Sequence, residues 1–199
     1  MGALVEIVGP WLADRGFKQD GASFRRFSET GDCLLVQFQP AHSATGDTFR
    51  FYLNIGLVLH SWLEWKAIQA SSPSYVPKID DAQLWSRLRD PSAEQFKDDW
   101  RVGVTPAHHS EAASRVVTCL EDALDTYSAH VDRARLLAAL RSGGHIEATM
   151  VNRRTAQALL LMDHGQSAEL EQLLNKLRLR GPEQSALADW IWRGASDVR

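Results

Sequence analysis

The sequence predicts an α+β fold: an antiparallel sheet with an N-terminal helix and a central helix on one of its faces, followed by an all-helical C-terminal extension. Three features of the apolar pattern lead to this prediction. Apolar residues recur at helical spacing near the N-terminus, at every second position in two runs between residues 33 and 59, and again at helical spacing from residue 110 onward. We expect residues 1–131 to form the α+β domain and residues 132–199 to form the extension.

The first helix is predicted from the stripe that Leu4, Val8 and Leu12 form at helical spacing. Arg15 and Gly16 supply a basic last turn and a glycine stop. Because Pro10 lies inside the stripe and lacks a backbone N–H, we expect a kink or a helix in two parts.

Alternation between apolar and polar residues predicts the strands. From Phe49 to Leu59 every second residue is apolar, and residues 33–39 repeat the pattern in a shorter run. Such alternation is typical of antiparallel strands with one face on a core. Residues 23–28, 84–88 and 100–104 are expected to add shorter strands.

Helical spacing returns at Ser110, which we expect to cap the central helix. Charge changes along the chain as well. Residues 1–132 carry 12 Lys/Arg and 18 Asp/Glu, a net charge of −6, whereas residues 133–199 carry 10 and 7, a net charge of +3. This difference predicts that the extension packs electrostatically on the front of the chain, although a modest drift in composition would give the same numbers.

Composition excludes several classes of protein. The chain is 44% apolar and 24% charged, which is ordinary for a globular protein, and its net charge of −3 argues against a nucleic-acid binder. The N-terminus lacks a basic region and a long apolar run, and no segment approaches the ~18 apolar residues of a membrane span. Cys33 and Cys119 are expected to be free thiols. We therefore expect a cytoplasmic protein that binds neither nucleic acid nor membrane.

No motif predicts catalysis. His60 and Glu64 have the spacing of zinc ligands on a helix but lack a third ligand nearby, and His108 and His109 are adjacent in a predicted loop. Nucleophile-elbow and phosphate-binding glycine motifs are missing from the sequence. We expect no metal or cofactor, and a protein without enzymatic activity.

The candidate binding residues lie on the polar side of the predicted sheet. A period of two places the polar members of both strands on one outward face, where amide, guanidinium and phenol groups can bind carboxylates or peptide backbone. Tryptophan and arginine from the following segment are expected to join them, because these residues anchor many protein interfaces. The predicted site comprises Gln37, Gln39, Arg50, Tyr52, Asn54, Trp85, Arg87 and Trp100. A merely solvated face with buried tryptophans is the competing interpretation.

A succession of short motifs resembles a known family. The motifs are Gly16-Phe17-Lys18 followed by Gly21, Phe24 and Arg26; then Val36-Gln37-Phe38-Gln39; then Asn54 and Gly56; then Trp85, Arg87 and Leu88; then Asp99-Trp100. In this order, over residues 4–128, they resemble a large, uncharacterised bacterial family of the domain-of-unknown-function type. Leu84-Trp85 and Trp100-Arg101 depart from the family's His-Trp and doubled Trp. The resemblance implies an α+β fold and a bacterial cytosol, and it implies no activity.

Our functional hypothesis is a non-catalytic module that recognises a protein or peptide through the polar face, with an immunity- or defence-associated partner as a refinement. Two alternatives remain open. One is a metal-assisted hydrolase that uses His60, Glu64, His108 or His109, and the other is a small-molecule binder between sheet and extension. The sequence does not determine the oligomeric state.

Overall fold

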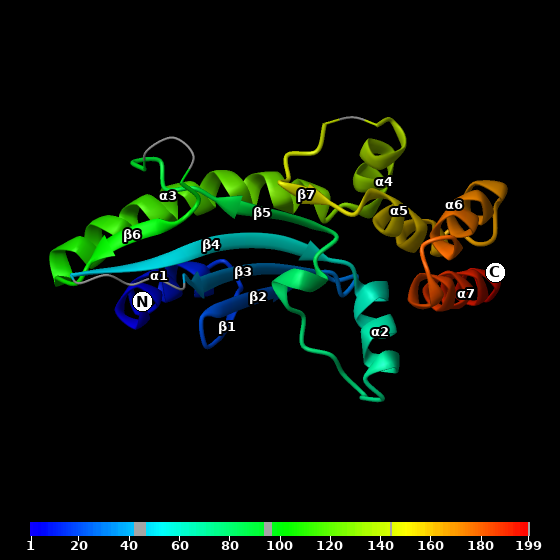
Figure 1. The fold of residues 1–199 in the computed structure, drawn as a ribbon, viewed down its shortest axis with the longest axis horizontal. Coiled ribbons are helices and arrows are strands. Elements are labelled where there is room, and N and C mark those ends of the chain that lie inside the picture. The colour runs from blue at the N-terminus through cyan, green and yellow to red at the C-terminus, as the bar shows by residue number, and fades with distance from the viewer. Residues whose placement is uncertain (42–46, 94–96, 144, 199) are drawn as a thin grey trace.

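The computed structural model describes residues 1–41, 47–93, 97–143 and 145–198, and its centre is a seven-stranded antiparallel sheet (Figure 1). The strands are β1 (Lys18–Asp20), β2 (Ser23–Phe27), β3 (Cys33–Pro40), β4 (Thr48–Val58), β5 (Leu84–Leu88), β6 (Trp100–Gly103) and β7 (Met150–Val151). Their order is β1-β2-β3-β4-β5-β7, and β6 pairs with the beginning of β4. The predicted α+β class is confirmed.

The register of β3 and β4 confirms the predicted alternation. Val36 pairs with Ile55 and Phe38 with Leu53, and all of these side chains are buried. They meet α1 (Gly2–Ala13) and α3 (Pro106–His130), whose apolar residues belong to the same core cluster. We call the opposite side of the sheet the outer face; the polar residues of β3 and β4 point toward it.

The remaining helices are α2 (His60–Gln69), the 3-10 turn η1 (Ile79–Asp81), α4 (Arg133–Arg141), α5 (Arg153–Met162), α6 (Ala168–Arg178) and α7 (Pro182–Ser196). Buried residues of α4 to α7 belong to the same core cluster as those of α1 and α3. Helices α5 to α7 gather beyond one end of the sheet, at the right of Figure 1. No helix in the described ranges has the length and apolar character of a membrane span.

Two helix boundaries differ from the sequence predictions. Helix α1 is one element with Pro10 inside it, so of the two expected forms, a kink or a division, the structure excludes the division into two parts. Helix α3 begins one turn before Ser110: Thr105 accepts a hydrogen bond from the backbone N–H of His108, and Pro106 occupies the first turn. A Thr cap followed by proline is a favourable helix start that the apolar spacing alone does not show.

The extension is helical apart from β7, which adds a strand to the sheet beside β5. Its first helix is fixed to the front of the chain by Arg133, which binds Asp32 through Nε (2.8 Å) and Nη2 (2.7 Å) and also pairs with Asp163. Trp190 of α7 packs against Trp65 of α2, with ring centroids 5.7 Å apart. The acidic front of the chain and the basic extension thus meet at the buried Asp32.

Residues 60–83 fold over part of the outer face, which the alternating pattern alone did not predict. Cys33, Val58 and Leu63 form a second buried cluster there. At Gly56 a Cβ atom would lie 2.9 Å from both the Ala82 Cβ and the Ile79 Cδ1, so only glycine allows η1 to approach β4 this closely. The rest of the outer face, where Gln39, Tyr52 and Arg87 are partly exposed, is the part that we call open.

Candidate functional site

The open part of the outer face brings together most of the residues predicted from the sequence. Asn54, only 1% exposed, lies at its centre. Its Nδ2 donates a hydrogen bond to Gln39 Oε1 (3.1 Å), and its Oδ1 accepts one from Arg87 Nε (3.3 Å). The register places Arg87 of β5 directly beside Asn54. Gln39 lies two residues beyond Gln37, the partner of Asn54 on β3, so neighbouring strands supply all three groups. Asn54 therefore orients the two side chains that flank it.

Aromatic rings hold the guanidinium of Arg87 in place. Its Cζ lies 4.0 Å from the centroid of Tyr52 and 5.7 Å from that of Trp85. Such stacking favours a cation while leaving the edge of the guanidinium able to donate hydrogen bonds. Beside it lies a small cavity of about 130 Å³, lined by Gln39, Asn54, Ile79, Asp80, Trp85 and Arg87.

The other arginines of the outer face are neutralised by carboxylates. Arg25 pairs with Asp20 (2.9 Å), and Arg50 and Arg101 both bind Asp99, at 2.6 and 3.2 Å. In the part of the chain that the structure describes, Arg87 has no carboxylate within ion-pair distance. The predicted residue Arg50 therefore belongs to a charge cluster with Asp99 rather than to the Arg87 group.

The Arg50–Asp99 pair makes stability depend on pH. The hydrogen bond from Arg50 lowers the pKa of Asp99 from 3.8 to about 2. A carboxyl group whose pKa is lower in the folded state stabilises the fold above its unfolded pKa and loses this contribution as pH falls through the folded value. We expect the Asp99→Asn variant to lack the part of the acid-induced loss that wild type shows between about pH 4 and pH 2. Urea unfolding at a series of pH values measures this difference, and parallel curves for the two proteins would contradict it.

Besides Arg50, two further predicted residues do not join the Arg87 group. Gln37 points to the outer face beside Asn54, but its buried Oε1 has no hydrogen-bond donor among the described protein atoms. Trp100 is fully buried on the opposite side of the sheet, stacked on Phe51 at 5.8 Å, with its indole N–H donating to the Leu88 carbonyl (2.8 Å). Trp100 therefore does not lie on the outer face with the other predicted residues, because β6 pairs with β4 in a register that turns it inward.

The residues considered for metal chemistry serve other contacts. His60 Nε2 lies 3.5 Å from Glu64 Oε1 on α2, at the surface. His108 lies over Gly103, and His109 packs edge-on against Phe49 at 5.5 Å, both at the start of α3. Within the described ranges, no three His, Cys, Asp or Glu side chains gather as a metal site.

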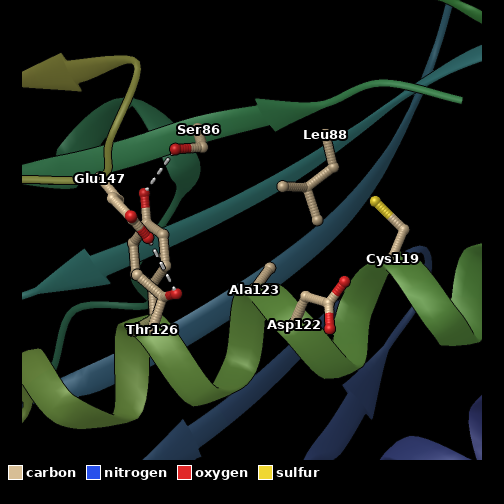
Figure 2. Close-up of a pocket in the computed structure, with 8 residues that line it drawn as sticks. Ser86, Leu88, Cys119, Asp122, Ala123, Thr126 and Glu147 are labelled. Atoms are coloured by element: carbon tan, nitrogen blue, oxygen red, sulfur yellow. Dashed lines mark hydrogen bonds between the residues drawn. The ribbon is translucent and has the colours of Figure 1, made fainter. Parts of the chain in front are cut away.

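A groove between β5 and α3 was not predicted from the sequence. It has a volume of about 280 Å³ and is lined by Ser86, Leu88, Cys119, Asp122, Ala123, Thr126, Tyr127 and Glu147. Figure 2 shows its two sides, β5 above and α3 below, with Glu147 reaching in from the segment before β7. The sequence gives little indication of this groove. Strand β5 is only five residues long, and the α3 residues that face it lie more than thirty positions away along the chain.

Burial limits the chemistry of the groove's thiol. It raises the pKa of Cys119 to about 11, so the thiol is protonated near neutral pH and is a poor nucleophile. Cys119 therefore contributes a neutral thiol to the lining of the groove.

An antiparallel sheet covered on one face by two helices, with an ordered polar group on the other, defines a small α+β domain. The chain belongs to the family described as DUF4304, a domain of unknown function, which it matches over residues 8–130. This confirms the predicted membership of an uncharacterised domain family. Comparison with curated proteins finds no match, and comparison with solved structures also finds none.

Proposed function

We propose that the chain is a non-catalytic binding module that recognises a protein or peptide through the open part of the outer face, with Arg87 as the group that binds a carboxylate. The observation that carries this proposal is the arrangement of Arg87. It is stacked on Tyr52, oriented by Asn54, and without a carboxylate partner among the described residues.

Preorganisation is what favours a binding role over a solvated surface. An ordinary surface arginine loses rotamer freedom when it binds a ligand, which reduces affinity. Arg87 has already lost this freedom, because two aromatic rings and the buried Asn54 fix its position in the folded chain. A carboxylate can accept paired hydrogen bonds from such a guanidinium.

The surroundings of Arg87 suit a peptide rather than an isolated anion. In the cavity lining, Gln39 and Asn54 supply amide groups, Trp85 supplies an aromatic surface, and Asp80 supplies a carboxylate acceptor. Donors and acceptors alternate along a peptide backbone, so an acidic peptide segment matches this mixed set.

The test is binding to an array of immobilised hexapeptides of randomised sequence. We expect the wild type to retain peptides rich in Asp and Glu. The Arg87→Ala variant should bind them with an affinity at least about tenfold lower, since a charge-assisted hydrogen bond is lost. Arg87→Lys should recover only part of the signal, because a lysine neither stacks nor forms paired bonds in the same way.

The matched control is Arg154→Ala, which removes the same charge from an exposed position on α5, away from the outer face. This variant should bind as the wild type does. Equal losses of peptide binding in both variants would show that net charge alone explains the effect and would contradict the proposal. Unchanged peptide binding by Arg87→Ala would overturn it as well.

A further inference from the structure

Among the residues that the structure describes, the edge of β5 has a strand neighbour along only part of its length. β4 pairs with β5 from Leu84 to Leu88, whereas β7 pairs only with Leu84 and Trp85 on the other side. From Ser86 to Leu88, no other strand in the described ranges lies beside this edge. An unpaired strand edge presents backbone groups that can accept a further strand.

The chain itself turns away from this edge. If β7 extended toward the N-terminus in its present register, Thr149 would lie beside Ser86 as the next strand pair. Instead, the Thr149 N–H donates to Ser86 Oγ (3.1 Å), and the Ala148 N–H donates to the Ile146 carbonyl (2.7 Å) in a tight turn. β7 thus pairs with the first two residues of β5, and the segment that precedes β7 does not pair with the remaining three.

The groove between β5 and α3 lies alongside this edge. Two hydrogen bonds close the end nearest β7: Tyr127 with Ser86 (3.0 Å) and Thr126 with Glu147 (3.3 Å) (Figure 2). Toward the other end the lining becomes apolar, with Leu88 on the strand and Ala123 on the helix. Side chains that alternate along an added strand would enter this space at every second position.

The charges at the groove are acidic. Asp122 and Glu147 line it, and the structure gives neither an ion pair with a basic side chain in the described ranges. We propose that the β5 edge and this groove form a strand-acceptor site for an extended basic segment of a partner protein. The segment adds antiparallel to β5, directs an apolar side chain against Leu88 and Ala123, and places Lys or Arg near the two carboxylates.

A second copy of this chain fits the site less well than a basic partner. Pairing two β5 edges would bring two sets of Asp122 and Glu147 together, and like charges facing each other are unfavourable. The site is also separate from the proposed function. Successive residues of a strand point to opposite faces, so β5 directs Arg87 to the outer face and Ser86 and Leu88 to the groove.

The probe is the fluorescein-labelled peptide acetyl-Thr-Lys-Thr-Val-Thr-Lys-Thr-amide, whose binding to the full chain is followed by fluorescence anisotropy. Its central Val and two Lys share one face of a strand, while the neutral Thr residues face Arg87. We expect binding that Asp122→Lys weakens about fivefold or more. The matched control, Asp125→Lys, makes the same charge change at an exposed residue of α3 outside the groove lining and should leave binding within about twofold.

Two further peptides test whether a strand forms. Each is N-methylated on one alternate set of amides, so that one loses the N–H groups that face β5 and the other loses those that face solvent. We expect one peptide to lose binding and the other to keep it, together with slower amide exchange at residues 86–88 in the complex.

Several outcomes would overturn the proposal. They are no binding of the unmodified probe up to about 1 mM, equal effects of both N-methylated peptides, equal effects of Asp122→Lys and Asp125→Lys, or a concentration-dependent dimer that competes with the probe. The two proposals are tested with different ligands: Arg87→Ala is measured on acidic peptides and Asp122→Lys on the basic probe. Failure of this site therefore shows in the second measurement and failure of the outer-face function in the first.

Discussion

Replacing Asp32 by alanine is expected to reduce the free energy of unfolding by about 3–5 kcal/mol, the range for breaking a buried ion pair from one side. Asp32 is 1% exposed and accepts hydrogen bonds from Arg133, from the backbone N–H of His60 (2.7 Å) and from Thr30 (3.0 Å). It therefore joins the start of β3, the start of α2 and the start of α4. Urea unfolding followed by circular dichroism measures the loss.

Asp20→Ala is the matched control, because Asp20 also pairs with an arginine but its side chain is 71% exposed. It should cost no more than about 1 kcal/mol. In the double variant with Arg133→Met, the loss should be smaller than the sum of the two single losses, since neither charge is then left without its partner. A cost for Asp32→Ala similar to that of Asp20→Ala would contradict the prediction.

Trp100→Ala is expected to cost about 3–5 kcal/mol as well, because it leaves a large cavity in the core. The indole is fully buried, stacks on Phe51, and donates its N–H to the Leu88 carbonyl. Loss of the indole also leaves that carbonyl without this donor.

Trp85→Ala is the control for Trp100→Ala, because the two substitutions should destabilise the fold to different extents. Trp85 lies on the outer face and is partly exposed, so its removal should cost about 1 kcal/mol. The same variant should weaken binding of acidic peptides, because Trp85 lines the cavity beside Arg87. Equal destabilisation by the two substitutions would contradict the placement of Trp100 in the core.

The fate of these two tryptophans shows how far sequence reasoning reaches. In β4 eleven residues repeat one alternation, so the faces of Tyr52 and Asn54 could be predicted with the period alone. In β6 only four residues form the strand, which is too short for a period to show which side chains face the core. Pairing with β4 determines that choice, and pairing is a property of the folded chain.

Burial of Asn54 and the groove beside α3 depend on contacts between distant segments. The local pattern placed Asn54 on the outer face, but its burial follows from the approach of residues 60–83 and from the side chain of Arg87. The groove needs the position of α3 relative to β5 and the turn at residues 146–148. None of these follows from spacing within one segment.

Asp32 also bears on how this chain relates to its family. The match ends at residue 130, and the cation that neutralises Asp32 is Arg133, in the helix that begins just beyond that boundary. A family member that ends at the boundary must supply a counter-ion from another element or carry an uncharged residue in place of the aspartate. Sequence changes at the two positions should therefore be correlated among relatives that possess the extension.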